Sequence, residues 1–436
     1  MTFLQCRAFL EELQRFGIKL GLENIRAVLA SFGDPHKTCP SILVAGTNGK
    51  GSVCAMLARI LAEHGLKVGL FTSPHLVKVE ERIRIGESLI SQNDFCRLLS
   101  LIRERIAVLM REDKLGNHPT FFETLTILAL LYFSEKKTDM AVLEVGMGGR
   151  FDATNVVKPL VSVITSVSKD HQEYLGTKIG QIAFEKAGII KPGVPVVCGI
   201  DGGEAHRVIR KRARELGAPF LGVFDEPGRF KAKKLKGRYR FSYRIGNRTY
   251  RFSPHLRGAH QGRNAAVAIA AASILSECWS TLKKNKIIRG IESADWEGRL
   301  EVVSRRPDVI LDGAHNEGGA RTLNAYVEDF IKPPVVLIFG MMKDKNIKRV
   351  ADILFPTVKR VILTSIPYSR AASPAEIWLT ARKFRRKIAL EHTLKKAIEI
   401  ARAEAGSRGT VIISGSLFLV GEAKKIFPKV GRGICA

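Results

Sequence analysis

Cysteine is scarce in this sequence, and its spacing contains no paired motif. The 436 residues include seven cysteines, an odd number, and no two of them form a C-x-x-C pair. This scarcity excludes a small disulfide-stapled scaffold. A chain of this length buries enough core to need neither disulfide nor metal staples. We expect buried, reduced thiols in a reducing compartment.

Long apolar runs and a leader sequence are also missing. The longest apolar stretch, residues 125–133, is far shorter than the ~20 residues that a membrane-spanning helix needs. Residues 1–8 do not form a basic region followed by an apolar run, as a secretory signal would. We therefore expect a cytoplasmic protein with no membrane partner.

Acidic residues are few relative to basic ones. The chain has 42 Asp and Glu against 70 Lys and Arg, and its formal net charge is +28. A basic surface attracts polyanions, which include nucleic acid, an anionic membrane and a substrate with several carboxylates and phosphates. Charge alone does not choose among these partners.

The segment 230–251 concentrates this charge, because Lys and Arg are interleaved there with Phe and Tyr. Such a segment could be a nucleic-acid patch. We favour a twisted hairpin whose outer face is solvated, since Gly246-Asn247 is a typical hairpin turn. A nucleic-acid partner is therefore not expected.

Short apolar runs alternate with amphipathic stretches, and this rhythm predicts an α/β fold. At ~150 residues per domain, the length suggests two or three domains. The first part predicts a mostly parallel sheet with helices on both faces. Its predicted strands are 41–45, 68–72, 140–145, 161–165 and 194–198, and its predicted helices are 52–64, 121–134 and 179–188.

The pattern changes near Arg229 to alternating basic and aromatic residues, which predicts a small antiparallel excursion. An Ala-rich stretch, 264–274, predicts a buried helix. After a polar interruption at 293–299 the α/β rhythm resumes, with predicted strands 309–312, 335–339, 361–364 and 411–414. We place a boundary near residue 296, between a phosphate-loop domain (1–296) and a smaller Rossmann-like α/β domain (297–436).

The strongest single motif is the run Gly46-Thr47-Asn48-Gly49-Lys50-Gly51-Ser52. It follows a predicted strand and opens a predicted helix, as a phosphate-binding loop does. Backbone N–H groups and the helix N-terminus attract anions there. Lys50 would neutralise the β- and γ-phosphates of ATP, and the Ser52 hydroxyl could bind Mg²⁺. Gly51 separates the lysine from the serine, unlike the common G-x-x-x-x-G-K-[ST] form, and a glycine-rich turn without nucleotide is the alternative.

Glu144 supports a nucleotide site, because it lies near the C-terminal end of a predicted apolar strand. That end of a parallel strand faces the crevice where such sheets bind ligands. One carboxylate, with hydroxyls and phosphates, would suffice for Mg²⁺. The alternative is an acid that Arg150 neutralises.

Six motifs occur in a fixed order along nearly the whole chain. They are the phosphate loop, Ser73-Pro74-His75-Leu76, Leu143-Glu144-Val145-Gly146, Asp152-Ala153-Thr154-Asn155, His260-Gln261-x-x-Asn264 and Asp312-Gly313-Ala314-His315-Asn316. The set resembles the Mur ligase superfamily and, within it, the folylpolyglutamate synthases, which are often also dihydrofolate synthases. The loop begins at Gly46, so we expect no UDP-substrate domain before it, unlike in the peptidoglycan Mur ligases.

The resemblance implies two Mg²⁺ sites. Ser73 and Glu144 would bind an ion shared with the nucleotide, and His171 a second one. Lys186 matches a lysine that is carbamylated in this superfamily, which would turn a cation into an oxygen ligand. The alternatives are an ordinary surface or core histidine and a helical lysine paired with Glu185 or solvent.

The resemblance also implies nucleotide contacts from both domains. Asn264 would contact adenine or ribose, and Arg299 would reach the phosphates when the domains close. Asp312 and His315 resemble nucleotide- and glutamate-side groups. For Asp312 a helix N-cap is an alternative, compatible with the first.

The pterin-bearing substrate would lie near the start of the chain and beside two later residues. These positions are Lys19, Leu20, Gly21, Leu22, Arg82 and Phe122. Apolar walls with a few polar groups suit a flat heterocycle. For Phe122 the alternative is a place in the helix core.

The implied activity is an ATP-dependent ligase that acts as a monomer. It would activate the carboxylate of dihydropteroate or a folyl-(poly)glutamate as an acyl phosphate and join it to L-glutamate. Lys50, Glu144, His171 and Lys186 would carry the catalysis. The alternatives are another Mur-type amide ligase, a phosphate-loop kinase or ATPase, and a nucleic-acid-binding protein acting through 230–251.

Overall fold

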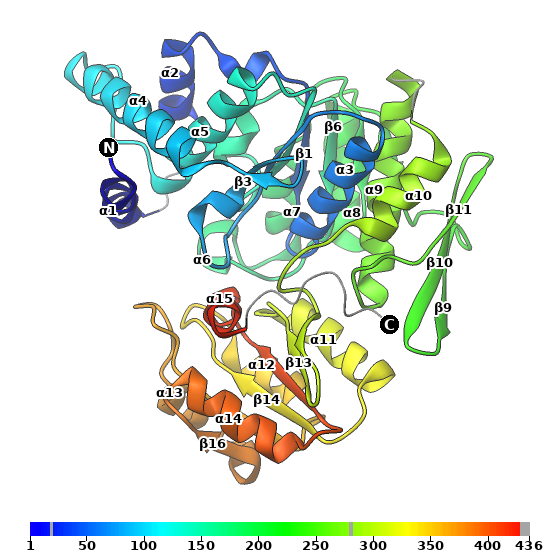
Figure 1. Ribbon diagram of the computed structural model, residues 1–436. Helices are drawn as coiled ribbons and strands as arrows, with labels where there is room; N and C mark the ends of the chain where they lie inside the picture. Colours follow the sequence, from blue (N-terminus) through cyan, green and yellow to red (C-terminus); the bar gives the residue numbers. More distant parts are fainter. Residues whose placement is uncertain (18–20, 279–281, 428–436) are drawn as a thin grey trace.

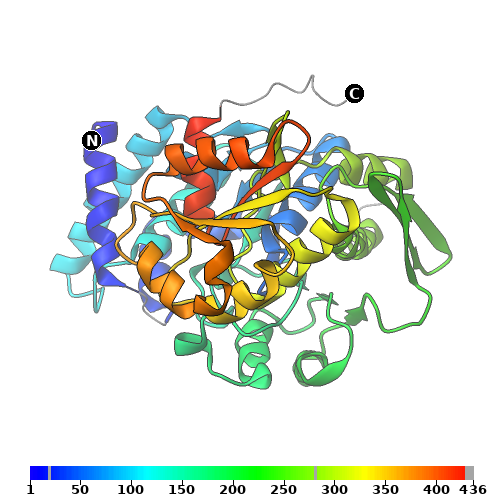
Figure 2. The ribbon, with the colours of Figure 1, turned by 90° about the horizontal axis from the view of Figure 1, so that it is seen from below.

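The structure is a computed structural model that describes residues 1–17, 21–278 and 282–427. It forms two lobes, drawn one above the other in Figure 1, and each is built around its own mostly parallel sheet. The smaller lobe lies across the middle of the larger one when seen from below (Figure 2). The prediction of two α/β units with a small antiparallel excursion is confirmed.

The larger lobe contains an eight-stranded sheet with one antiparallel edge, formed by β3 and β4. In spatial order its strands are β4 (Ser88–Leu89), β3 (Ile83–Ile85), β2 (Val68–Phe71), β5 (Met140–Glu144), β1 (Ser41–Ala45), β6 (Val161–Ile164), β7 (Val196–Cys198) and β8 (Phe220–Gly222). All five strands predicted in this part exist, and their ends differ by at most two residues.

The central strand β1 is apolar on both faces because helices cover both. Leu43 and Ala45 belong to one core, whereas Ile42 and Val44 belong to the other. Successive side chains of a strand point to opposite faces, which explains this alternation. One face carries α1 (Phe3–Leu13), α2 (Glu23–Ser31), α4 (Gln92–Arg111), α5 (Phe121–Glu135), α7 (Ile179–Ala187) and α8 (Gly203–Glu215). The other carries α3 (Lys50–Glu63), α9 (Ala259–Cys278) and α10 (Lys284–Ser293).

Short helical segments lie in the connections of this lobe. They are η1 (Gln14–Phe16), η2 (Pro35–Lys37), η3 (Val79–Arg82), η4 (Ala153–Val156) and α6 (Gln172–Leu175). Among the described residues, no helix combines the length and the apolar character needed to cross a membrane.

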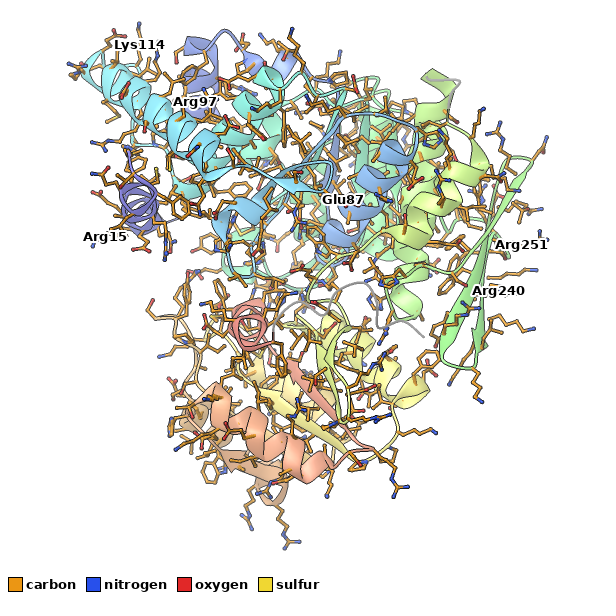
Figure 3. The ribbon with its side chains drawn as sticks, in the orientation of Figure 1. Arg15, Glu87, Arg97, Lys114, Arg240 and Arg251 are labelled. Atoms are coloured by element: carbon orange, nitrogen blue, oxygen red, sulfur yellow. The ribbon has the colours of Figure 1, made fainter. Side chains whose placement is uncertain are left out.

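A three-stranded antiparallel sheet stands at the edge of the larger lobe (Figures 1 and 2). It consists of β9 (Phe230–Leu235), β10 (Arg238–Ile245) and β11 (Arg248–Phe252), so the predicted hairpin exists and gains one strand. Tyr243 and Tyr250 are buried in the core with α9. Arg240 and Arg251 are exposed and point outward (Figure 3).

The smaller lobe contains a six-stranded sheet in which only β12 is antiparallel. Its order is β12 (Glu301–Ser304), β13 (Asp308–Leu311), β17 (Thr410–Ser414), β14 (Val335–Phe339), β15 (Arg360–Leu363) and β16 (Ile388–Leu390). One face carries α11 (Glu317–Phe330), α12 (Ile347–Leu354), α13 (Pro374–Thr380) and η5 (Arg382–Lys387), and the other α14 (Leu394–Ala405) and α15 (Leu417–Ile426). The connection from α10 to β12 contains residue 296.

Candidate active site

The phosphate loop joins the end of β1 to the start of α3. Gly49 is the N-cap of α3 and has a φ of 86°, in the left-handed region that favours glycine. A Cβ atom on Gly49 would lie 2.5 Å from Oδ1 of Asn264, so a larger residue would also displace that side chain. Glycine at position 49 therefore permits the backbone conformation of the loop and leaves room for the Asn264 side chain of α9.

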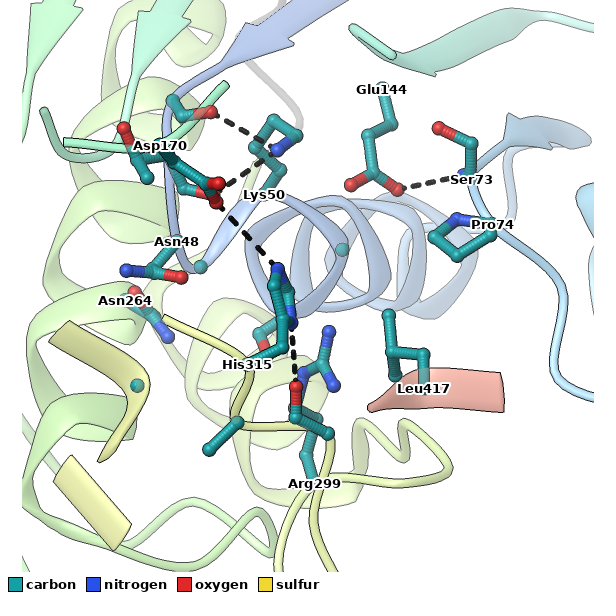
Figure 4. Close-up of a pocket in the computed structure, with 18 of the residues that line it drawn as sticks. Asn48, Lys50, Ser73, Pro74, Glu144, Asp170, Asn264, Arg299, His315 and Leu417 are labelled. Carbon is teal, nitrogen blue, oxygen red and sulfur yellow. Dashed lines mark hydrogen bonds and ion pairs between the residues drawn. The ribbon is translucent and has the colours of Figure 1, made fainter. Parts of the chain in front are cut away.

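Lys50 is the first residue of α3 and folds back over the loop. Its Nζ donates to the carbonyl oxygens of Gly46 at 3.0 Å and Thr47 at 3.3 Å (Figure 4). The ammonium group therefore lies within the curve of the loop, at the positive end of the helix. This is the charge distribution that attracts phosphate.

Glu144 ends β5 beside this loop and is only 4% exposed. Its Oε2 accepts one hydrogen bond, from the backbone N–H of Ser73 at 3.1 Å (Figure 4). Burial raises the pKa of Glu144, and the charges of Lys50 and Arg299 counteract part of this effect. A cation in the crevice would favour the charged form of this carboxylate.

Lys186 is a buried amine on α7, with 3% of its surface exposed. Burial, reinforced by the charge of Lys50, lowers the pKa of Lys186 to about 7, although Asp170 and Asp152 oppose the shift. At neutral pH a large fraction of this amine is therefore uncharged and nucleophilic.

Arg150 and Glu185 form an ion pair with each other, with 2.7 Å between Nη2 and Oε1. This pair makes two alternatives wrong. Arg150 does not neutralise Glu144, and Lys186 is neither paired with Glu185 nor exposed to solvent. Glu144 and Lys186 both line the crevice instead.

His171 follows β6 in a left-handed backbone conformation, with a φ of 49°. Its side chain is 39% exposed at the crevice. Partial burial of the ring, together with the charges of Lys345 and Lys50, lowers its pKa to about 4, even though the charge of Asp170 opposes this shift. At neutral pH the imidazole is uncharged, which is the form that can bind a metal ion.

The smaller lobe contributes Arg299, Asp312 and His315 to the same crevice (Figure 4). Asp312 accepts from the backbone N–H groups of Leu300 and Ala314, both at 3.0 Å. The N-cap of α11 is Asn316, so the alternative that Asp312 caps a helix is wrong. Asp312 instead fixes the turn that presents Arg299.

One crevice between the lobes is lined by every predicted catalytic, nucleotide and metal residue. These are Gly46, Thr47, Asn48, Gly49, Lys50, Gly51, Ser52, Ser73, Glu144, His171, Lys186, Asn264, Arg299, Asp312 and His315. They come from the C-terminal end of β5, from the loops that follow β1, β2, β6 and β13, from the connection between α10 and β12, and from helices α3, α7 and α9. The roles assigned to them stay predictions.

The predicted substrate residues that the structure describes lie outside that lining. Lys19 and Leu20 fall outside the described residues, and Leu22, next to Gly21, is buried as the N-cap of α2. Arg82 and Phe122 also lie outside the lining. The Arg82 guanidinium lies 5.1 Å from the ring centroid of Phe121, and the ring of Phe122 packs against Gly146, which lines the crevice.

Gln261 is a site residue for which the sequence analysis predicts no role. It is fully buried on α9. Its Nε2 donates to Oγ of Ser52 at 3.2 Å, and its Oε1 accepts from Nδ2 of Asn264 at 2.9 Å. It thus connects the phosphate loop to the helix that carries Asn264. Gln261 and Asn264 are three residues apart, so a helix places both on one face. This spacing was the sequence signal that could have identified Gln261 as a site residue.

Comparisons with known proteins agree with this geometry. The Mur ligase middle domain family matches residues 44–272, and the family described as Mur ligase, glutamate ligase domain matches residues 298–417. A dihydrofolate synthase/folylpolyglutamate synthase of Bacillus subtilis is 35% identical over 97% of this chain and 99% of its own length. A protein of the same description from Escherichia coli is 31% identical over 96% of this chain and 94% of its own length.

Solved structures extend the comparison to the whole fold. Folylpolyglutamate synthase of Mycobacterium tuberculosis, complexed with ADP and AMPPCP, has a TM-score of 0.89 at 29% identity and 98% coverage of both chains. E. coli FolC, in complex with DHPP and ADP, has a TM-score of 0.84 at 30% identity and 97% coverage of both chains. The chain therefore belongs to the Mur ligase family and, within it, to the dihydrofolate synthases and folylpolyglutamate synthases.

Proposed function

We propose that this chain ligates L-glutamate to the carboxylate of dihydropteroate or of a folyl-(poly)glutamate, with hydrolysis of ATP to ADP and phosphate. The observation that carries the proposal is the crevice between the lobes. There a phosphate loop, a buried carboxylate, a buried lysine with a lowered pKa and an arginine from the second lobe line one space. The names of relatives that cover 97% of the chain support the same reaction.

The oxygen donors beside the loop fit Mg²⁺. Among the described residues, no cluster of three or more His, Cys, Asp or Glu could hold a metal on its own. Glu144 and the hydroxyls of Ser52 and Ser73 line the crevice together, and Mg²⁺ accepts such oxygens along with phosphates and waters. When bound, the ion would offset phosphate charge.

Lys186 is proposed to bear a carbamate. The uncharged amine would attack CO₂, forming an N–C bond and losing one proton, so that a buried cation becomes an anionic oxygen donor. Its pKa of about 7 makes this reaction accessible at neutral pH. Lys50 supplies a neighbouring positive charge. The carbamate and His171 would then hold a second Mg²⁺.

The remaining steps follow from position and charge. Lys50 and the loop N–H groups hold the phosphates while a substrate carboxylate oxygen attacks the γ-phosphorus and the bond to ADP breaks. The nitrogen of L-glutamate then attacks the acyl carbon, loses a proton, and phosphate leaves. Arg299, on the second lobe, neutralises phosphate charge when the lobes meet, and closure keeps water out.

The test is ADP release by purified protein with dihydropteroate or tetrahydrofolate, each with and without L-glutamate. We expect release that depends on both the pterin and L-glutamate, with a glutamylated product detected by mass spectrometry. ADP release without any amine would favour a kinase or ATPase. An absence of product with either pterin would contradict the folate substrate and leave the ligase class standing.

We also propose that the chain acts as a monomer in the cytoplasm. The crevice is complete within one chain, because both lobes supply its lining residues. Light scattering after size exclusion should give a mass near 48.2 kDa. A stable dimer would contradict the monomer.

A further inference from the structure

Asp170 is a buried carboxylate of the larger lobe that is contacted mainly by the smaller lobe. It is 9% exposed and lies between β6 and α6. Lys345 donates to its Oδ1 with a distance of 2.7 Å from Nζ, and Asn316 donates to its Oδ2 with a distance of 2.9 Å from Nδ2. The Lys345 side chain is itself only 10% exposed.

Asn316 connects this contact to the phosphate loop. Its Nδ2 also donates to Oδ1 of Asn48 at 3.0 Å, and Nδ2 of Asn48 donates back to Oδ1 of Asn316 at 3.2 Å. The same Oδ1 accepts from the backbone N–H of Gly319 and caps α11. Asn48 of the loop is therefore bonded directly to the residue that caps α11.

The energetics of this cluster depend on whether the lobes are together. A buried carboxylate is stable only beside a counter-charge and hydrogen-bond donors. For Asp170 most of the donors and the counter-charge come from the smaller lobe. If the lobes part, Asp170 and Lys345 are both hydrated and nothing is left unpaired. If they close without Lys345, the carboxylate is buried with only the imidazoles of His315 and His171 beside Asn316, at 3.7 and 4.0 Å, and without a lysine counter-charge, which is unfavourable.

We propose that Asp170, Lys345 and Asn316 form a latch that holds the lobes closed and, through Asn48, makes closure depend on the position of the phosphate loop. These are positioning residues, which act through the arrangement of the lobes. The latch rests on the proposed ligase reaction, because its consequence is read in the fate of the acyl phosphate.

The latch predicts a specific defect when it is broken. In closed lobes the acyl carbon is attacked by the amine of L-glutamate. In parted lobes water attacks it, which breaks the acyl–oxygen bond and returns the original carboxylate and phosphate. ADP is then released without product, so the ratio of product to ADP falls below one.

The test compares Lys345→Met with Lys343→Met. Lys343 lies on the same segment, and its partner Glu376 is 3.4 Å away at the surface, with both side chains about half exposed. We expect Lys345→Met to lower the rate of product formation by about 10- to 100-fold and to lower the product-to-ADP ratio. The KM for ATP should change by less than about threefold, because the loop contacts in the larger lobe remain. Lys343→Met should match the wild type.

A second variant and a structural readout complete the test. Asn316→Ser keeps a capping oxygen but loses both amide donations, so it should lower the same ratio. Small-angle scattering with AMPPCP and dihydropteroate should show a larger radius for Lys345→Met than for Lys343→Met. A wild-type ratio and radius in both Lys345→Met and Asn316→Ser would overturn the latch. A wild-type enzyme without glutamate-dependent ADP release would overturn the proposed function instead.

Discussion

Glu144 shows how a single residue can be held ready for a cation. It is buried with one hydrogen bond from a backbone N–H, and burial raises its pKa despite nearby positive charge. A buried carboxylate with so few partners costs stability, as functional residues often do. Glu80 is equally buried, at 4% exposure, but accepts from Gln92 and lies outside the crevice lining. The two residues form a matched pair for mutation.

Glu144→Gln should impair magnesium use without unfolding the protein. Loss of the anionic oxygen should raise the Mg²⁺ concentration needed for half-maximal ADP release by at least about tenfold and lower kcat/KM by about 100-fold or more. The melting temperature should stay the same or rise, because a neutral amide is easier to bury. Glu80→Gln is the control. An unchanged Mg²⁺ requirement in Glu144→Gln would contradict its role.

Lys186 should make the folded state sensitive to pH in a definite direction. Its pKa is about 7 in the folded protein and about 10.4 in an unfolded chain, so the unfolded state binds more protons between these values. Stability therefore rises with pH across this window and is lowest below pH 7.

Lys186→Met should consequently be more stable and inactive. In CO₂-free buffer at pH 6, we expect the free energy of unfolding to increase by roughly 2–5 kcal/mol, a gain that shrinks toward pH 10. Calorimetry at pH 6, 8 and 10 measures this difference. Ligation should fall by about 100-fold or more. A gain that is independent of pH would mean that Lys186 is not titrating in this window.

The sequence predicted which residues line the crevice better than it predicted their partners. Motif order brought fifteen residues to one place, because loops at the carboxyl ends of parallel strands converge. The partners were missed where they are distant in sequence. Asp170 and Lys345 are 175 positions apart, and no local pattern pairs them. The ion pair of Arg150 with Glu185, rather than with Glu144, was also missed, because these two residues are far apart in the sequence.

At the scale of elements, strands buried on both faces were the easiest to predict. Their apolar runs stand out between polar connections, as in β1, β5 and β14. Short edge strands, including β4 and β16, were not predicted, because two or three partly exposed residues give no periodicity. Helix α3 begins at Lys50 rather than at Ser52, since Gly49 is its N-cap.

Substitutions in the β9–β11 sheet can show whether this strongly basic element is needed for the reaction. Its outer face carries exposed cations, and charges on a solvated surface contribute little to stability. Replacing Lys233, Arg240 and Arg251 together by Gln should leave glutamate-dependent ADP release within about twofold and the melting temperature nearly unchanged. Kinetics and calorimetry check this.

A core position of the same sheet supplies the contrast. Phe241 is 3% exposed and stacks on Phe252, so Phe241→Ala should cost about 3–5 kcal/mol of unfolding free energy.

Fluorescence anisotropy with a labelled duplex tests the nucleic-acid alternative. Tight, steeply salt-dependent binding that the triple variant abolishes would show that the outer face is a nucleic-acid site.

At the scale of the molecule, the lobes meet in several places. Lys234 and Tyr239 of the β9–β11 sheet bond to Asp329 at the end of α11, and the loop after β2 contacts α15. The loop after β2 is held by Glu81, whose carboxylate accepts from the backbone N–H groups of Leu76, Val77 and Lys78. Leu76 then packs against the core of the smaller lobe. The sequence predicted two α/β units with a boundary near residue 296. It could not predict this contact, because the contact depends on how the lobes sit together.

Gly421 on α15 is where that contact is tightest. A Cβ atom there would lie 2.0 Å from the carbonyl oxygen of Leu76, in the other lobe. Gly290 on α10 is also too close to its neighbours for a side chain, but within one lobe, since its Cβ would lie 2.6 Å from Cα of Ile60. The same substitution at the two positions should therefore have different consequences.

Gly421→Ala should separate the lobes slightly while leaving each lobe folded. Alanine favours a helix over glycine by about 1 kcal/mol, so the melting temperature should hold or rise, while ligation per folded molecule falls by about tenfold. Gly290→Ala should do the opposite: the melting temperature falls, and the molecules that stay folded keep their activity. Calorimetry and product formation, measured on both variants, decide the matter. A lower melting temperature for Gly421→Ala with normal activity per folded molecule would mean that the Leu76 contact serves the fold of the smaller lobe rather than the closure of the two.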